Sequence, residues 1–190
     1  MLAIMSPTKY LFMIQTEISF DFGGAGSSPG QFNKPQGIAF DSNNQLYVAD
    51  TDNSRVQIFD HEGNFLRVFG EKVQPAALSM PVDVAFDREG HVYILDQDYL
   101  SLMTYSSTGS LLLITGSQHQ SKGRLGLSKP AALFIDFNDR IYISDTRNSR
   151  VTVWQYLNES YLAKKPVTKE DIQKLTAFLE KNSKAFTEKK

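Results

Sequence analysis

The residues of this sequence that could most readily bind a metal ion or transfer a proton are its three histidines, His61, His91 and His119. A metal centre needs several such side chains to converge on one point. The chain is built from repeated units, and no two histidines fall at equivalent positions of those units. A symmetric fold would keep them apart, so we expect solvated histidines and predict no catalytic residue, no metal ligand and no cofactor.

Three aspartates do fall at equivalent positions, and each ends an apolar run directly before a turn. Equivalent carboxylates could form a ring for acid–base chemistry, but a carboxylate at the end of a strand is well placed to accept N–H groups from the turn. In the first and third copies an arginine, Arg55 or Arg150, follows within reach across the turn. We therefore predict a structural role for the turn residues Asp50, Asp96, Asp145, Asn53 and Asn148.

Basic residues gather in the connections and turns. Lys122 and Arg124 share one long connection, while Arg55, Arg147 and Arg150 occupy turns expected on the same face. A basic face of this kind could bind RNA. Acidic residues lie beside it, however, and the chain carries 20 Lys and Arg against 21 Asp and Glu. We therefore expect no nucleic acid as the partner and keep RNA binding as an alternative.

The composition excludes several further kinds of site. The 190 residues include no cysteine, which rules out disulfides, thiolate zinc sites, iron–sulfur clusters and covalently attached haem. The glycine-rich stretch 23–28 precedes an expected strand, so it lacks the helix N-terminus of a phosphate-binding loop. The apolar run 10–14 is too short to span a bilayer, and we expect no membrane insertion.

The elements that carry these residues repeat along the chain. Three passages align without gaps: KPQGIAFDSNNQLYVADTDNSRVQIF (34–59), MPVDVAFDREGHVYILDQDYLSLMTY (80–105) and KPAALFIDFNDRIYISDTRNSRVTVW (129–154). Successive copies are 46 and 49 residues apart. A unit of constant length joined by variable connections is typical of modules stacked on a common scaffold.

Each unit alternates with the period of a β-strand. Ile38 and Phe40 in the first run, and Leu46 and Val48 in the second, stand between smaller or polar residues. The first two runs are separated by residues that tolerate positive φ, as a tight hairpin requires: Asn43-Asn44, Glu89-Gly90 and Asn138-Asp139. A third run follows in every unit, and a glycine turn then leads to a fourth run in the first two units. Four antiparallel strands in about 45 residues are the pattern of a propeller blade.

Four stretches of these units have a distinctive sequence pattern: PQGIAFD (35–41), LYVADTDNSRVQIF (46–59), GNFLRVFG (63–70) and IYISDTRNSRV (141–151). They resemble the repeats of the NHL-repeat β-propeller family, over about residues 9 to 157. The resemblance implies an all-β fold of NHL-type four-stranded blades, three per chain. Some relatives are metal-dependent lyases or lactone hydrolases and some bind RNA, so both activities are alternatives that the resemblance leaves open.

The turn of the second unit departs from the pattern. Tyr99 and Leu100 stand where the sister units have polar residues, and Ser101 stands where they have arginine. Two large apolar groups in a turn could contact a partner, or pack against a neighbouring blade or the terminal helix. The residues predicted to bind a partner are Tyr99, Leu100, Arg55, Arg147, Arg150, Lys122 and Arg124.

Three blades are too few to close a ring. We expect residues 1–23 to supply a strand that completes a terminal blade, residues 24–166 to form the three blades, and residues 167–190 to form a helix and tail. The third unit lacks the motif of a fourth strand, so two chains could exchange their N-terminal strands and close a six-bladed homodimer. The alternatives are blades encoded elsewhere, or a different protein that completes the array.

The C-terminal segment changes to a helical pattern. Thr168 is a candidate N-cap before an acidic first turn, and Ile172, Leu175 and Phe178 lie on one stripe. The resulting short amphipathic helix could pack on the side of the propeller or dock on a partner.

Taken together, these features predict a non-catalytic protein–protein recognition scaffold whose partner is another protein or a second copy of itself. A metal-dependent lyase or lactone hydrolase on the same propeller is the alternative from a different class, and metal analysis of the purified protein separates the two. The compartment stays open. Resemblance to exported bacterial proteins favours the periplasm or the extracellular space if a leader has been removed, and otherwise the chain is expected to be cytoplasmic.

Overall fold

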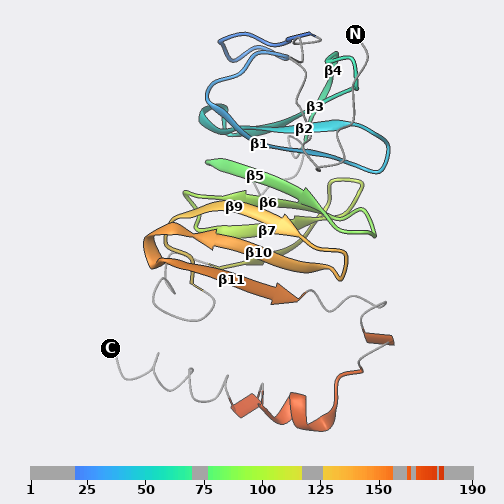
Figure 1. Cartoon of the computed structure of the whole chain (residues 1–190), viewed down its shortest axis with the longest axis vertical. Helices are drawn as coiled ribbons and strands as arrows, with labels where there is room; N and C mark the ends of the chain where they lie inside the picture. The colour runs from blue at the N-terminus through green and yellow to red at the C-terminus, as the bar shows by residue number, and fades with distance from the viewer. Residues whose placement is uncertain are drawn as a thin grey trace, which may run out of the picture.

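The computed structural model of the chain describes residues 20–69, 77–116, 126–155, 162–163, 166–174 and 176–177. The strands form three antiparallel sheets; the first lies at the top of Figure 1, and the second and third overlap below it. Each sheet corresponds to one repeat of the sequence. The all-β architecture with three propeller-type blades per chain is therefore confirmed.

The first two blades have four strands each and the third has three among the described residues. Blade 1 consists of β1 (Pro35–Phe40), β2 (Leu46–Asp50), β3 (Arg55–Phe59) and β4 (Phe65–Phe69). Blade 2 consists of β5 (Pro81–Phe86), β6 (Val92–Asp96), β7 (Ser101–Tyr105) and β8 (Leu111–Thr115). Blade 3 consists of β9 (Pro130–Ile135), β10 (Arg140–Asp145) and β11 (Arg150–Gln155). Consecutive strands pair in each blade.

The hairpin between the first two strands of each blade turns on one residue with positive φ. This residue is Asn44 (φ 60°) in blade 1, Gly90 (82°) in blade 2 and Asp139 (58°) in blade 3. Glycine, asparagine and aspartate adopt this conformation at the lowest cost. The hairpin positions expected from the sequence are therefore confirmed.

Each blade has two faces, because successive side chains of a strand point to opposite sides of its sheet. We call the face toward the next blade along the chain the forward face, and the opposite one the rear face. The strand registers place on the forward faces Ala39, Tyr47, Val56 and Ile58 of blade 1, Ala85, Tyr93, Leu102 and Thr104 of blade 2, and Phe134, Tyr142, Val151 and Val153 of blade 3. The rear faces carry Ile38 and Phe40, Val84 and Phe86, and Leu133 and Ile135, respectively.

The forward face of blade 1 packs on the rear face of blade 2. Tyr47, Val56 and Ile58 are buried in one cluster with Val84 and further residues of blade 2. The rings of Tyr47 and Phe86 meet edge to face, with centroids 4.8 Å apart.

The same contact recurs between blade 2 and blade 3. Tyr93 and Leu102 of the forward face are buried in a second cluster with Leu133 and Ile143 of the rear face, and Ile135 packs against this cluster. Burying apolar sheet surface is what holds the blades together, at roughly 25 cal/mol per Å² removed from water.

A short segment before blade 1 covers the outer part of its rear face. The ring centroids of Phe22 and Phe59 are 5.0 Å apart, and those of Phe32 and Phe59 are 5.4 Å apart. Residues 20–24 are not in a strand. Most of the expected strand-supplying segment, residues 1–19, lies outside the described residues, and the proposed exchange of strands stays a prediction.

The C-terminal segment contains the expected short helix, at residues 169–174 and 176–177. Thr168 begins it as predicted: its hydroxyl oxygen accepts the N–H of Asp171 (3.2 Å), and the Asp171 carboxylate accepts the N–H of Thr168 (3.0 Å). Ile172 is exposed, as are the other helical residues whose side chains are described. Leu175 and Phe178 of the predicted stripe lie outside that set.

Candidate functional site

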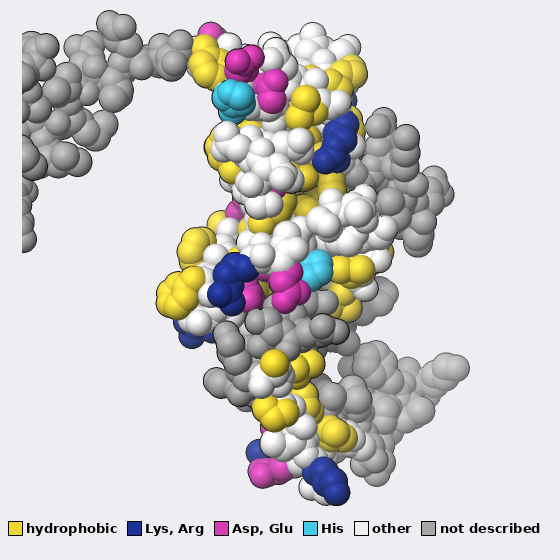
Figure 2. Space-filling view, turned by 90° about the vertical axis from the view of Figure 1, so that its right-hand side faces the viewer, with side chains coloured by type: hydrophobic (Ala, Val, Ile, Leu, Met, Phe, Trp, Pro, Cys, Tyr) yellow, Lys and Arg dark blue, Asp and Glu magenta, His cyan; other side chains and the backbone are white. Residues whose placement is uncertain are grey.

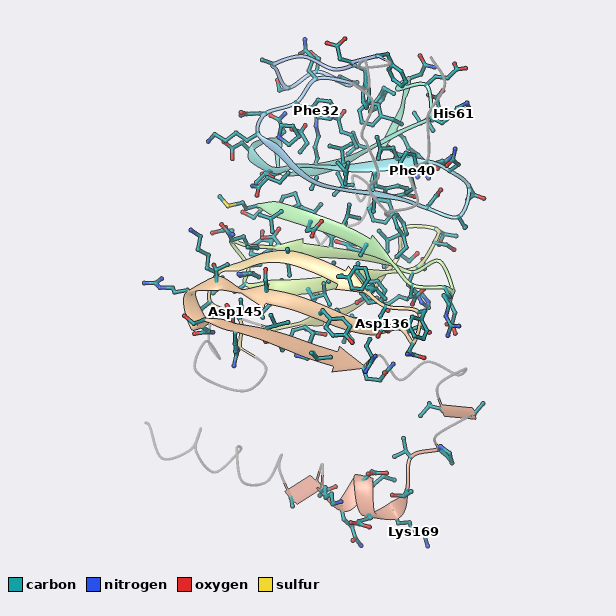
Figure 3. All side chains as sticks on the ribbon, in the orientation of Figure 1. Phe32, Phe40, His61, Asp136, Asp145 and Lys169 are labelled. Carbon is teal, nitrogen blue, oxygen red and sulfur yellow. The ribbon has the colours of Figure 1, made fainter. Side chains whose placement is uncertain are left out.

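Two edges of the blades carry the polar residues that the sequence singles out. The turns between second and third strands line one edge, which we call the turn edge, and the hairpins between first and second strands line the other, the hairpin edge. Figure 3 shows this separation in blade 3, where Asp145 lies at the turn edge and Asp136 at the hairpin edge.

Asp50 is fully buried at the turn edge of blade 1. Its carboxylate accepts the N–H of Asn33 (2.7 Å), the amide of Asn53 (2.9 Å) and Nε of Arg55 (2.7 Å). The amide of Gln57 donates to the same carboxylate (3.0 Å). These bonds join the turn, the third strand and the connection before β1, so this aspartate fixes three segments at once.

Asp96 and Asp145 of the other two blades are also fully buried; Asp96 accepts backbone N–H groups, and Asp145 keeps the asparagine and arginine donors as well. Asp145 accepts the N–H groups of Ser128 (2.9 Å) and Lys129 (3.1 Å), and Nε of Arg150 lies 3.2 Å from it. These bonds to N–H groups outweigh desolvation by burial and lower the pKa of Asp145. A carboxylate held in this way is an ionised hydrogen-bond acceptor and has no proton to donate near neutral pH.

Of the predicted binding residues, Arg55 and Arg150 are held by this network. The side chain of Arg55 is 15% exposed, and besides Asp50 it donates to the carbonyl oxygens of Ser27, Ser28 and Gln31. Arg150 bonds to Asp145 and to the carbonyl oxygen of Gly126. Arg147 lies exposed in the neighbouring turn. Lys122 and Arg124 of the predicted basic cluster lie outside the described residues.

The turn of blade 2 keeps the backbone of its sisters despite its different sequence. Leu100 has φ 51°, close to Ser54 (54°) and Ser149 (49°). Leu100 packs against the cluster between blades 2 and 3, whereas Tyr99 is 40% exposed. Ser101 replaces the arginine of the sister turns. Its Oγ is buried and has no hydrogen-bond partner among the described residues. Of the two apolar residues, Tyr99 is thus the one available to a partner.

The first strands of the three blades meet around Asp83 of β5. Its carboxylate accepts the N–H of Leu133 in β9 (2.7 Å) and of Val84 (2.9 Å). Burial raises the pKa of Asp83, and the two N–H bonds oppose that rise without cancelling it. Sequence reasoning missed this residue, because its sister positions are Gly37 and Ala132 and nothing in the repeat pattern marks it.

The described histidines belong to different blades, and of the expected solvated histidines His91 is only 20% exposed. His61 is exposed in the turn before β4, and His91 bonds through Nδ1 to the carboxylate of Asp87 (2.8 Å) at the hairpin edge. His119 lies outside the described part. Within that part, no group of three or more His, Cys, Asp or Glu side chains is arranged to hold a metal ion.

A groove of about 420 Å³ opens between β8 of blade 2 and β11 of blade 3. Leu113, Val153 and Trp154 line it together with threonine, tyrosine and glutamine side chains, and none of its lining residues is charged. The groove could accept an apolar group, but it offers no acid, base or nucleophile activated by a base.

The most unusual surface feature is a pair of apolar blade faces, one at each end of the stack, on which no further blade packs among the described residues. The forward face of blade 3 exposes Phe134 (64%), Val151 (64%) and Val153 (52%), and the rear face of blade 1 exposes Ile38 (62%) and Phe40 (54%). Apolar side chains reach the surface at several levels of the stack (Figure 2). Exposed apolar faces of this kind are uncommon on folded proteins and mark contacts with proteins, membranes or ligands.

The sequence pattern of the NHL repeat matches residues 32–59, the stretch that runs from the connection before β1 through β3. The chain contains an NHL repeat. The matched residues include the buried Asp50 and the partly buried Asn53 and Arg55 of the turn described above.

Curated proteins match stretches of about a quarter of the chain. The NHL-repeat chain is 52% identical over 50 residues to Protein brain tumor of Drosophila melanogaster, covering 26% of this chain and 5% of that protein. It is 49% identical over 45 residues to Protein lin-41 of Caenorhabditis elegans, covering 24% and 4%. The matched segments therefore span about a twentieth of the length of these relatives.

Among solved structures, a streptogramin B lyase is similar to this chain with a TM-score of 0.47 and 12% sequence identity, covering 72% of this chain and 44% of the lyase.

In the described part of the chain, no helix is both long enough and apolar enough to cross a bilayer.

Proposed function

We propose that this chain is a non-catalytic protein-recognition scaffold. The observation that carries the proposal is the pair of uncovered apolar blade faces, on which five large side chains are more than half exposed. Inside the stack, the equivalent faces are buried against another blade. A polypeptide surface with the same alternation of apolar side chains is the natural cover for them.

The turn edge offers a second, smaller contact surface in this proposal. Tyr99 projects from the middle blade on a turn that Asp96 fixes through the N–H groups of Asp98 (3.1 Å) and Tyr99 (3.0 Å). An exposed tyrosine on a rigid turn loses little conformational entropy when it is buried, which suits a binding residue. Arg147 lies at the same edge of blade 3.

The experiment replaces Phe134 by the photo-crosslinking residue p-benzoylphenylalanine in cells that naturally make the chain. We expect irradiation to join residue 134 to one defined polypeptide, identified by mass spectrometry, and a charge at Val153 to abolish the adduct. The same crosslinker at Leu112, an exposed position on the outer strand of the middle blade, is the control. Adducts at 134 that are absent, no stronger than at 112, or formed with nucleic acid would disprove the proposal.

A further inference from the structure

The two uncovered faces are the two halves of a contact that the chain already makes twice within itself. Blade 1 meets blade 2, and blade 2 meets blade 3, each time forward face to rear face. Among the described residues, no further blade packs on the forward face of blade 3 or on the rear face of blade 1. Resting on the proposed function, we propose that a second copy of this chain is the partner, with the forward face of blade 3 packed on the rear face of the partner's blade 1.

Equivalent residues change from buried to exposed when the next blade is absent. On the forward faces, Val56 and Leu102 are buried at 0% and 1% exposure, while Val151 at the same position is 64% exposed. On the rear faces, Val84 and Leu133 are buried at 2% and 8%, while Ile38 is 62% exposed. The side chains at the ends are therefore of the kind that these positions bury elsewhere.

The aromatic contact between blades specifies the geometry of the new interface. In the first internal contact, Tyr47 packs edge to face on Phe86. Their equivalents at the open ends are Tyr142 on the forward face of blade 3 and Phe40 on the rear face of blade 1. A second copy placed as the next blade brings Tyr142 against the partner's Phe40.

A hydrogen bond between adjacent blades at the turn edge also repeats along the chain. Thr51 Oγ1 donates to the carbonyl oxygen of Pro81 in the next blade (2.8 Å), and the Gln97 amide donates to that of Pro130 (2.8 Å). The third copy of this position is Thr146, which is exposed and donates to the carbonyl oxygen of Lys129 within its own blade. In the proposed dimer, Thr146 lies next to the partner's Pro35, as Thr51 lies next to Pro81 within the chain.

The chemistry of both faces fits this partner. The exposed residues Ile38, Phe40, Phe134, Val151 and Val153 carry no charge, so neither a nucleic acid nor a charged membrane surface complements them. A forward-to-rear contact between two chains occurs twice, and the two contacts close a ring of six blades, three from each chain.

One position of the new interface differs from the internal ones. Phe134 stands where the internal forward faces have Ala39 and Ala85, and its ring lies 6.2 Å from that of Tyr142. The second copy must accommodate a phenyl group where an internal blade meets a methyl group. Phe134→Ala therefore restores the internal pattern and is expected to leave the dimer intact.

The first test measures the mass of the purified chain in solution by light scattering after size exclusion, over a series of concentrations. We expect twice the chain mass of 21.4 kDa. Phe40→Asp and Phe134→Asp should each raise the dissociation constant of the dimer at least about 30-fold, because each buries an unpaired charge in the interface. Leu112→Asp, on a blade with both faces already covered, should leave it unchanged.

The second test uses the absence of native cysteine. Phe40→Cys and Tyr142→Cys chains are purified separately, mixed, and treated with a short bismaleimide, which joins only thiols that lie close together. We expect crosslinked dimers in the mixture and none with either variant alone. Crosslinking within a single variant would show a face-to-face dimer and overturn the head-to-tail arrangement.

A monomer at every concentration, or a dimer insensitive to both aspartate substitutions, would also overturn this inference. The two proposals fail separately. If the purified chain is a monomer but residue 134 still forms an adduct with one defined polypeptide in cells, the second copy is not the partner and the recognition scaffold stands. If the adduct is absent as well, both proposals are wrong.

Discussion

Gly37 in β1 and Asp83 in β5 approach so closely that a Cβ atom on residue 37 would lie 2.5 Å from the Cα atom of Asp83. Real Cβ atoms do not come that near to a backbone atom, so the contact between the first strands of blades 1 and 2 requires a residue without a side chain. Asp83 in turn binds the N–H of Leu133 in β9. This pair therefore sets the distance between the first two blades and links them to the third.

The first prediction follows from that approach. Gly37→Ala should destabilise the chain by about 1–3 kcal/mol, because the added methyl group forces the two strands apart. The free energy of unfolding in urea measures the effect. Ala132→Gly makes the reverse exchange at the equivalent position of blade 3. It reports how much the difference in backbone flexibility between glycine and alanine changes the free energy of unfolding, about 0.5–1 kcal/mol at most. Equal stability of Gly37→Ala and the wild type would contradict the close contact.

The second prediction concerns the buried carboxylate of Asp145. Asp145→Ala removes the acceptor for Ser128, Lys129, Asn148 and Arg150. Groups that lose a buried partner keep their full desolvation cost, so we expect a loss of about 2–3 kcal/mol in urea unfolding. Asp52→Ala, which removes a surface ion pair with the exposed Lys34, should cost less than about 1 kcal/mol. Unchanged unfolding of Asp145→Ala would refute the structural role of this residue.

The third prediction is a dependence of stability on pH through Asp136 at the hairpin edge. Desolvation opposes its ionisation, but the N–H groups of Arg140 and Asn138, the Arg140 guanidinium and the Tyr142 hydroxyl outweigh it and lower the pKa to about 2. A carboxyl whose folded pKa lies below its unfolded value of about 4 stabilises the fold above that value. This stability is lost as the pH falls from about 4 through about 2.

Urea midpoints between pH 5 and pH 2 test the role of Asp136. Asp136→Asn should make the midpoint fall less steeply over this range, since the variant has no carboxyl to protonate there. Asp21→Asn, which removes one carboxylate from an exposed position, controls for the change in charge. Identical slopes for wild type and Asp136→Asn would show that other carboxyls carry the pH dependence.

The fourth prediction addresses the hydrogen bond from Thr51 to blade 2. Thr51 is buried, and Thr51→Val keeps its shape while leaving the carbonyl oxygen of Pro81 without this donor. We expect a loss of about 1–2 kcal/mol in the free energy of unfolding. Thr108→Val in an exposed turn, where water can replace the hydroxyl, should change it by less than about 0.5 kcal/mol. A smaller effect at Thr51 than at Thr108 would mean that water reaches the Pro81 carbonyl.

The sequence was most informative where local rules act alone. Alternation located the strands of all three blades, and the residues at Asn44, Gly90 and Asp139 located the hairpins, because both depend on the conformational preferences of a few neighbouring residues. The recurrence of Asp50, Asp96 and Asp145 at strand ends pointed to their place in turns for the same reason. These features repeat, and repetition makes a local signal visible without an alignment.

The sequence was less informative about which side chains are free. Arg55 and Arg150 were predicted to bind a partner, yet the structure holds them against carboxylates five residues away and against carbonyl oxygens 24 to 28 residues away. Tyr99 and Leu100 looked alike, yet Leu100 packs against the cluster between blades 2 and 3 while Tyr99 stays exposed. Such differences depend on the packing of separate segments, which no local pattern encodes.

By itself, the sequence determined the type of unit, its number and its internal strands, since hydrogen bonding within a hairpin and the two-residue period of side chains are properties of short segments. Only the tertiary structure decided which faces are buried, how closely Gly37 approaches Asp83, and that one forward and one rear face remain uncovered. Burial is decided by what stands beside a residue in space, so identical positions such as Val56 and Val151 become core in one blade and surface in another.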